Sequence, residues 1–239
     1  MKIIITGATS GMGRQLALDY HNSGQEVWAI GRNEDSLAEL RSLGMHTGQI
    51  DLTDSETSLA WFANLESIDL AILNAGTCEY IDMPNFDSSL VKRVMRANVE
   101  SLAVSIEGVL PLLRKSAIPH LAVVGSSAAY LPLPRAEAYG GSKAAVAYMV
   151  DTLRIALTKE KIVVSLICPG FVKTPLTDRN DFPMPFRITT EEASNYIRKG
   201  IAGKKAGIHF PKRFTYILKF LSLLPRPLWN AIAQRMVKE

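Results

Sequence analysis

Residues 2–13 read Lys2-Ile3-Ile4-Ile5-Thr6-Gly7-Ala8-Thr9-Ser10-Gly11-Met12-Gly13. The β-branched run predicts a short strand over residues 2–6, and a helix is expected from about residue 12. The glycines between them permit a tight turn and a close approach of the backbone to a pyrophosphate, while the helix offers its positive N-terminus to the anion. This order of strand, glycine-rich turn and helix predicts a dinucleotide-binding fold.

The rest of the chain continues the alternation of short apolar runs with longer amphipathic segments. Strands are expected at residues 2–6, 26–30, 47–50, 69–73, 119–125, 162–167 and 207–210. Helices are expected at residues 12–23, 34–42, 54–64, 87–113, 138–159 and 189–202. Because the strands are almost continuously apolar, both faces of their sheet must be covered. The sequence therefore predicts an α/β fold, a doubly wound Rossmann-type parallel sheet of about seven strands with helices on both faces.

Local signals mark two helix starts and one interruption. Thr53 with Glu56, and Thr189 with Glu192, have the spacing of a capping box, in which a hydroxyl and a carboxylate bind backbone amides of the first turn. Residues 168–188 contain four prolines and interrupt the alternation. We interpret this stretch as a loop over a ligand site at the carboxyl ends of the strands.

Composition limits the class of protein. A chain of 239 residues, 47% apolar and 21% charged, can bury a large core without disulfides. Cys78 and Cys168 are too few for a disulfide framework or a metal cluster, and we expect both to be small buried side chains. The four histidines form no motif, so no metal is expected. The first apolar run is too short for a signal peptide, and a cytoplasmic protein is expected.

Positive charge is concentrated at the C-terminal end. Residues 204–239 hold eight basic residues and one acidic residue, a net charge of +7, whereas the rest of the chain carries −3. This distribution does not predict a nucleic-acid-binding surface. We expect residues 1–210 to form a single catalytic domain and residues 211–239 to be its basic, amphipathic extension. The extension could lie on an anionic membrane as a peripheral contact, cover a substrate cleft or pack on a partner subunit.

Tyr139 and Lys143 form the sharpest chemical signal. On a helix, residues four apart lie on one face, so the phenol and the ammonium are neighbours. A free tyrosine has a pKa near 10, and a nearby cation favours the phenolate and lowers that pKa. The pair can then act as a general acid and base.

The end of the second strand indicates which dinucleotide is bound. An NAD site normally presents a carboxylate there to hold the ribose hydroxyls. This chain has Arg32 and Asn33 instead, and its first acid is Glu34. A guanidinium suits a 2′-phosphate, so NADP(H) is the predicted cofactor, with NAD(H) as the alternative.

These motifs together resemble the short-chain dehydrogenase/reductase family over residues 2–175. The resemblance rests on the Gly-x-x-x-Gly-x-Gly spacing of the first turn, on Asn74-Ala75-Gly76, on Tyr139-x-x-x-Lys143 and on the thirteen residues from Ser126 to Tyr139. It implies an NADP(H)-dependent oxidoreductase that transfers a hydride between the nicotinamide and a carbonyl or alcohol substrate. Four catalytic residues are implied: Asn98, Ser126, Tyr139 and Lys143.

The resemblance also assigns a role to each of these residues. Ser126 orients the substrate oxygen, Tyr139 exchanges its proton, Lys143 tunes Tyr139 and binds the nicotinamide ribose, and Asn98 holds a water that relays protons. Ser127 is the rival to Ser126. The cofactor would be bound by Gly7, Thr9, Ser10, Gly11, Met12, Gly13, Arg32, Asn33, Asp51, Leu52, Asn74, Ala75, Gly76, Tyr139, Lys143, Pro169, Gly170, Val172 and Thr174.

Substrate and assembly are predicted more coarsely. The loop over residues 175–188 is apolar, which favours a hydrophobic ketone or aldehyde. Members of the family commonly form dimers or tetramers through two long helices, here at residues 87–113 and 138–159. A nucleotide-binding regulator or membrane-associated scaffold without chemistry is the alternative function, and the complete catalytic set argues against it.

Overall fold

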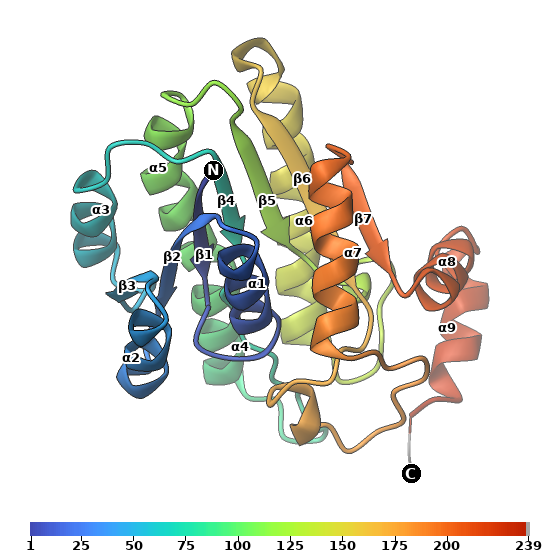
Figure 1. The fold of residues 1–239 in the computed structure, drawn as a ribbon. Helices are drawn as coiled ribbons and strands as arrows, with labels where there is room; N and C mark the ends of the chain where they lie inside the picture. Colours follow the sequence, from blue (N-terminus) through green and yellow to red (C-terminus); the bar gives the residue numbers. More distant parts are fainter. Residues whose placement is uncertain (238–239) are drawn as a thin grey trace.

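A parallel sheet of seven strands forms the centre of the molecule (Figure 1), and the computed structural model describes residues 1–237. The strand order is β3-β2-β1-β4-β5-β6-β7. The strands are β1 (Lys2–Thr6), β2 (Glu26–Gly31), β3 (His46–Gln49), β4 (Leu70–Leu73), β5 (His120–Val124), β6 (Val163–Pro169) and β7 (Gly207–Phe210). The predicted doubly wound architecture is confirmed, and the order reverses between β1 and β4, where this fold binds ligands.

Helices cover both faces of the sheet, as predicted. One face carries α1 (Gly11–Asn22), α2 (Glu34–Ser42) and α7 (Thr190–Ala202). The other carries α3 (Ser55–Ala63), α5 (Ser101–Leu113) and α6 (Glu137–Ala156), with α4 (Ser88–Met95) packed beside α6. Successive residues of β1 show why both faces are apolar: Ile3 and Ile5 lie in one core and Ile4 in the other. The near-continuous apolar strands follow from this double burial.

The long helix predicted at residues 87–113 is interrupted. A π-helical turn, η1 (Arg96–Glu100), separates α4 from α5. Such a turn inserts one extra residue per turn, and it often marks a functional site. Here it carries Asn98, whose side chain is buried.

One of the two predicted capping boxes is wrong. The N-cap of α3 is Asp54, which accepts a hydrogen bond from the Thr57 amide at 3.2 Å. Thr53 instead donates its hydroxyl to Asp51 at 2.8 Å, so it is not free to cap the helix. The box at α7 is confirmed, because Thr189 and Glu192 each accept a bond from the other's amide.

The C-terminal extension packs on the body through two helices, α8 (Lys212–Leu221) and α9 (Arg226–Gln234). Leu218 and Trp229 are buried against Leu131, and the Trp229 indole donates to the Pro132 carbonyl at 2.8 Å. Residues 238 and 239 of the predicted extension lie outside the described residues. The tail is thus attached by its apolar inner side, with each helix keeping an outer side toward solvent.

A partly buried polar chain joins the extension to β7. The Lys219 ammonium lies 2.9 Å from His209 Nε2, and His209 Nδ1 lies 2.7 Å from the Tyr130 hydroxyl. Burial lowers the pKa of His209 to about 4, so the ring is neutral. Lys219 therefore donates to Nε2, and the proton on Nδ1 is donated to Tyr130. This chain fixes α8 beside the sheet edge.

Substitution of Gly13 tests whether the glycine-rich turn after β1 depends on close packing. A Cβ at Gly13 would lie 2.2 Å from the Gly7 carbonyl oxygen, whereas a Cβ at Gly141 would meet no atom within 4 Å. We expect Gly13→Ala to lower the free energy of unfolding by about 1–3 kcal/mol. The matched Gly141→Ala should raise it by up to about 1 kcal/mol, because alanine stiffens the unfolded chain. Urea unfolding measures both, and equal stability of the two variants would contradict the packing argument.

Candidate active site

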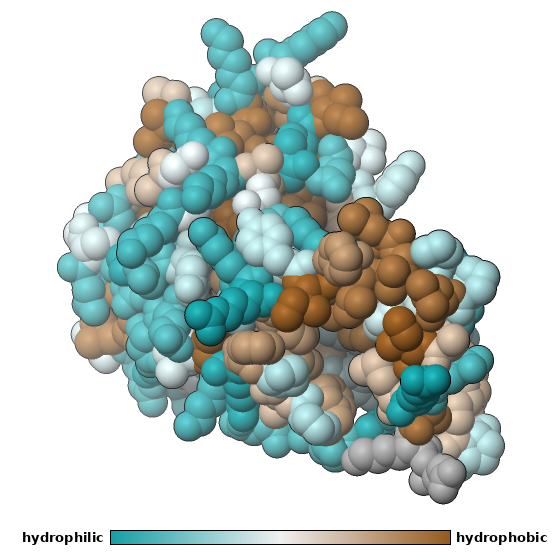
Figure 2. All heavy atoms as spheres, turned by 90° about the vertical axis from the view of Figure 1, so that its right-hand side faces the viewer, coloured by the Kyte–Doolittle hydropathy of each residue, from teal (hydrophilic) through white to brown (hydrophobic). Residues whose placement is uncertain are grey.

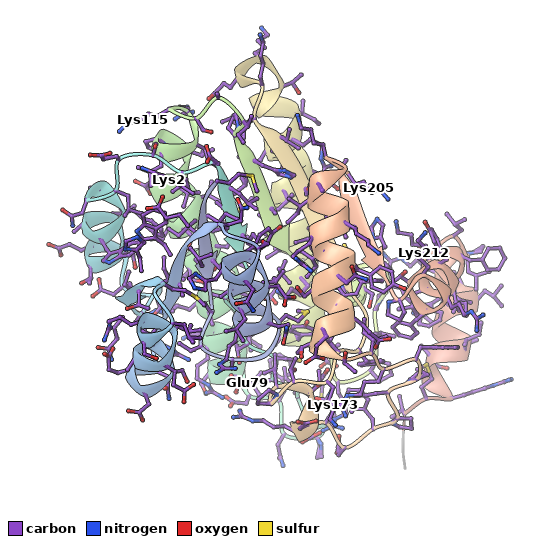
Figure 3. All side chains as sticks on the ribbon, viewed as in Figure 1. Lys2, Glu79, Lys115, Lys173, Lys205 and Lys212 are labelled. Carbon is purple, nitrogen blue, oxygen red and sulfur yellow. The ribbon has the colours of Figure 1, made fainter. Side chains whose placement is uncertain are left out.

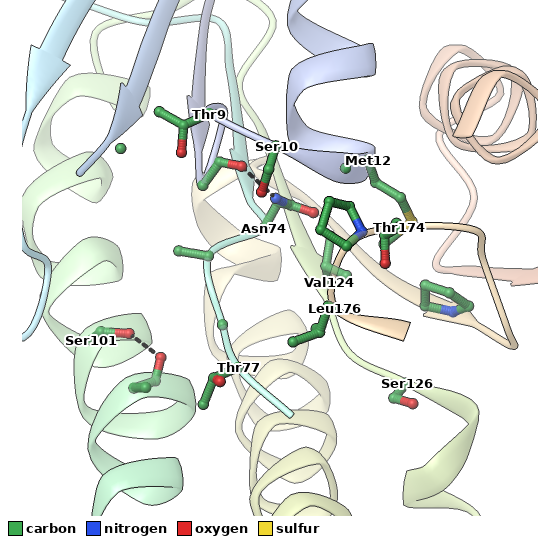
Figure 4. Close-up of a pocket in the computed structure, with 18 of the residues that line it drawn as sticks. Thr9, Ser10, Met12, Asn74, Thr77, Ser101, Val124, Ser126, Thr174 and Leu176 are labelled. Carbon is green, nitrogen blue, oxygen red and sulfur yellow. Dashed lines mark hydrogen bonds between the residues drawn. The ribbon is translucent and has the colours of Figure 1, made fainter. Parts of the chain in front are cut away.

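A cavity of about 410 Å³ opens at the carboxyl ends of the strands. Its walls come from the turns after β1, β2, β4, β5 and β6 and from the start of α6. Figure 3 shows Glu79 and Lys173 at this end of the sheet and Lys2 and Lys115 at the opposite end. In Figure 4, Thr9 and Ser126 lie at opposite ends of the pocket. The cavity is therefore elongated across the switch point between β1 and β4.

The glycine-rich turn forms the middle of the pocket wall. Gly7 and Gly11 have φ angles of +64° and +52°, which only glycine adopts at little cost. A Cβ at Gly7 would lie 2.9 Å from the Ala75 Cα, and one at Gly11 would lie 3.1 Å from the Thr174 side chain. These contacts leave a backbone cradle at the N-terminus of α1, and such a cradle fits a pyrophosphate.

Asn74 ties the turn after β1 to the end of β4. Its side-chain amide donates to the carbonyls of Thr6 and Gly7 at 3.1 and 3.2 Å. Its backbone amide donates to the Thr6 hydroxyl at 2.9 Å. The Asn-Ala-Gly segment thus holds the glycine turn in place as well as lining the pocket.

The turns after β2 and β3 meet at one end of the cavity. The Arg32 guanidinium is 77% exposed and lies 4.0 Å from the Asp51 carboxylate. A hydrogen bond from the Thr53 amide holds the pKa of Asp51 below its usual value. This end therefore presents an exposed cation beside a hydrogen-bonded anion.

The other end of the cavity gathers three of the four predicted catalytic residues. Ser126, Tyr139 and Lys143 all line the pocket. The Lys143 ammonium is buried and donates to the Val124 carbonyl at 3.0 Å. Its Nζ lies 5.9 Å from the centre of the Tyr139 ring. Ser127 is buried and does not line the pocket, which favours Ser126 of the two rival serines.

The net shift of the Tyr139 pKa is upward in this geometry. Burial raises the pKa of Tyr139, the nearby Cys78 thiol raises it further, and only a hydrogen bond with Ser126 acts in the other direction. Burial also lowers the pKa of Lys143 to about 8. For Tyr139, desolvation outweighs the hydrogen bond with Ser126, and the tuning of Tyr139 by Lys143 stays a prediction.

Asn98 lies behind the pocket and braces it. Its side-chain oxygen accepts from the Thr77 amide at 2.7 Å, and its amide donates to the Thr77 carbonyl and the Ser142 hydroxyl, both at 2.9 Å. Both amide hydrogens are used in these bonds, while the oxygen accepts only one and lies beside Gly76 of the pocket wall. The predicted water relay stays a prediction.

Most of the predicted cofactor residues line the cavity, with two exceptions. Asn33 caps α2, accepting from the Ser36 amide at 2.8 Å. Gly13 packs under the turn against Gly7. The residues found in the pocket are Gly7, Thr9, Ser10, Gly11, Met12, Arg32, Asp51, Leu52, Asn74, Ala75, Gly76, Tyr139, Lys143, Pro169, Gly170, Val172 and Thr174.

Sequence reasoning missed several residues that the fold adds to the site. Thr177 and Arg179 line the cavity from the proline-rich loop. Cys78, predicted to be buried, is half-buried, and burial raises the pKa of its thiol to about 11. Tyr80 places its ring 6.3 Å from that of Tyr139. No sequence motif marks these positions, although Cys78 and Tyr80 lie two and four residues after Gly76 along the chain.

Comparison with known proteins agrees with this geometry. Residues 1–182 match the family model described as short chain dehydrogenase. The chain belongs to the short-chain dehydrogenase/reductase family. An uncharacterized oxidoreductase of Myxococcus xanthus is 32% identical over 98% of this chain and 96% of its own length. The protein is thus an oxidoreductase of this family.

Solved structures of the same fold include both cofactor types. A short chain dehydrogenase of Burkholderia cenocepacia in complex with NADP has a TM-score of 0.85 and 22% identity, covering 100% of this chain and 98% of its own. A family member from Burkholderia phymatum in complex with NAD has a TM-score of 0.80 and 22% identity, covering 91% of each chain. At these identities the likeness shows the fold of this short-chain dehydrogenase/reductase.

The buried Lys143 predicts a pH-dependent stability. Its pKa is lowered from 10.5 to about 8, so between these values the unfolded chain binds the additional proton and the free energy of unfolding rises with pH. Relative to Lys143→Met, the wild type should gain roughly 3 kcal/mol between pH 7 and pH 10.5. Chemical denaturation at several pH values measures this gain. Lys199→Met, at an exposed lysine of α7, should show no such trend, and a pH-independent difference for Lys143→Met would contradict the assignment.

Proposed function

We propose that this protein is an NADP(H)-dependent reductase of hydrophobic ketones or aldehydes. The observation that carries the proposal is the meeting of Ser126, Tyr139 and Lys143 at one end of an elongated cavity whose middle is the glycine turn. The glycine cradle fits a pyrophosphate, so a dinucleotide bound there would extend toward the three side chains. When bound, NADPH supplies a hydride for the carbonyl carbon.

The residues of the pocket would complete the reduction. Ser126 would bind the carbonyl oxygen and orient it. Tyr139 would donate its phenolic proton to that oxygen as the hydride reaches the carbon, which gives the alcohol and a phenolate. The raised pKa of Tyr139 keeps the phenol protonated beforehand, as a general acid requires. Lys143 would hold the ribose hydroxyls and stabilise the phenolate until a proton returns from solvent.

Preference for NADP(H) over NAD(H) rests on Arg32. Its guanidinium is exposed, and the preceding Gly31 packs against Thr9, which lies across the pocket from Ser126 in Figure 4. The adenosine half would lie at this end. A 2′-phosphate there would gain a charge-assisted hydrogen bond. Asp51 lies close to Arg32: its Oδ1 accepts from the amide and the hydroxyl of Thr53, and its Oδ2 is 4.0 Å from the guanidinium. The Burkholderia cenocepacia structure in complex with NADP is consistent with this preference.

A row of aromatic rings indicates a hydrophobic substrate. From Tyr80, next to Tyr139, the row continues to Phe182 at 5.2 Å between ring centres, to Phe171 at 6.1 Å and to Phe214 of α8 at 5.3 Å. Rings this close shield an apolar molecule from water. We therefore expect the carbonyl substrate to carry an apolar group that lies along this row.

The outer face of α6 supports the expected self-association. Tyr148 and Ile155 are 79% and 78% exposed on this helix. Large apolar side chains on an otherwise packed helix commonly mark an interface. We expect a homodimer or homotetramer in which α6 of one subunit packs on that of its partner.

Replacement of Tyr139 tests the proposed chemistry. Tyr139→Phe should lower kcat for NADPH-dependent reduction of an apolar ketone or aldehyde by roughly 100- to 10,000-fold, because the proton donor is lost. NADPH should still bind, as measured by fluorescence titration. Tyr80→Phe, which removes a hydroxyl from the neighbouring ring, is the matched control and should retain activity. Equal activity of Tyr139→Phe and wild type would overturn the mechanism. NADPH binding without turnover of any carbonyl by the wild type would favour the regulator instead.

Replacement of Arg32 tests the cofactor preference. Arg32→Ala should lower kcat/KM for NADPH by roughly 10- to 100-fold, the value of a hydrogen bond between charged groups. The same constant for NADH should change little. Arg14→Ala removes an arginine that pairs with Glu39 outside the pocket, and it should affect neither cofactor. Loss of NADPH and NADH activity to the same extent would contradict the assignment of Arg32 to the 2′-phosphate.

A further inference from the structure

The outer sides of α8 and α9 form a continuous apolar surface, named here the tail face. Figure 2 looks onto this side of the molecule and shows apolar side chains gathered over these helices. The exposed apolar residues of the tail face are Tyr216, Ile217, Phe220, Leu223, Leu228, Ile232, Met236 and Val237. Phe220 and Leu223 are 69% and 80% exposed. Side chains of this size are rarely left in water in such number without a partner.

The tail face is surrounded by positive charge. Residues 193–238 contain no aspartate or glutamate. Lys212, Arg213, Arg226 and Arg235 are exposed on the same two helices, and Figure 3 shows Lys212 on this side of the molecule. In the part of the chain that the structure describes, these four cations form no salt bridge. Their charge is therefore free to attract an anionic partner.

The inner sides of the helices hold the tail face in place. Thr215, Leu218 and Trp229 are buried, and Trp229 is bonded to Pro132. Tyr216 and Phe220 of α8, and Leu223 just after its end, are exposed at helical spacing opposite this anchored side. The docking of the two helices on the body therefore keeps these side chains in solvent. Rotating the helices to bury them would break the packing of the inner side.

We propose that the tail face docks on the surface of an anionic lipid bilayer. Two short amphipathic helices that present an apolar face among cations are suited to the boundary between headgroups and acyl chains. No helix within residues 1–237 is long and apolar enough to span a bilayer, so the contact is peripheral. A second copy of this chain fits the face poorly, because a two-fold contact would bring cation against cation with no local acid to pair them.

The aromatic row ends on the inner side of α8, directly behind the tail face. Phe214 lies on α8, and its ring is 5.3 Å from Phe171 and 6.4 Å from Phe186. The row then leads to Tyr139 through Phe182 and Tyr80. If the proposed function holds, an apolar carbonyl compound dissolved in the bilayer would reach the site along this row. The docking itself does not depend on that function.

Vesicle sedimentation of the full chain tests the proposal. Wild type should sediment with vesicles of phosphatidylcholine and phosphatidylglycerol, much less with pure phosphatidylcholine, and less at high salt. Phe220→Ser with Leu223→Ser should weaken binding at least tenfold. Arg226→Gln with Arg235→Gln should also weaken it, by about fivefold per charge. Leu43→Ser with Ile118→Ser removes two exposed apolar side chains elsewhere, 52% and 53% exposed, and should bind like wild type.

Several results would overturn the proposal. One is absence of the wild type from the pellet with anionic vesicles. Another is equal binding by wild type and the Phe220/Leu223 variant. A third would be seen in sedimentation velocity, if the Phe220/Leu223 substitutions convert an oligomer to a monomer without loss of lipid binding. That result would make the tail face a contact between subunits. Thermal unfolding of each variant establishes that it is folded, and no readout requires turnover.

Discussion

The close approach of two loops at the switch point of the sheet is the constraint on which the site depends. The turn after β1 passes so near the end of β4 that a Cβ at Gly7 would lie 2.9 Å from the Ala75 Cα. Asn74 joins the two with hydrogen bonds to Thr6 and Gly7. Because the chain leaves β1 and β4 toward opposite faces of the sheet, a crevice opens between them. The cofactor cradle and the catalytic end of the cavity are both built around it.

Burial governs the chemistry at the catalytic end. Desolvation raises the pKa of Tyr139 and lowers that of Lys143, so both groups are displaced toward their neutral forms. Nearby hydrogen bonds offset part of this: Lys143 is held by the Val124 carbonyl, and Ser126 favours the phenolate. A neutral phenol is suited to donate a proton to a carbonyl oxygen.

The C-terminal extension presents two chemically different sides. Its inner side packs on the body, with Phe214 reaching the aromatic row and Lys219 bonded to His209. Its outer side remains apolar and cationic. An amphipathic helix has two sides, so covering the approach to a site and meeting a membrane are compatible. Because α8 lies beside β7, its inner and outer sides are both held in fixed positions relative to the sheet.

The sequence by itself determines the strands and the β1 turn, because β-branched runs and glycine spacing act through local backbone preferences. It also determines the pairing of Tyr139 with Lys143, four residues apart on one helix. Only the tertiary structure decides which groups surround that pair. Three features depend on packing. They are the π-helical turn that directs Asn98 toward Thr77, the capping of α2 by Asn33, and the approach of Phe214 to Phe171. The direction of the Tyr139 pKa shift also depends on packing, because desolvation depends on segments that are far apart in the chain.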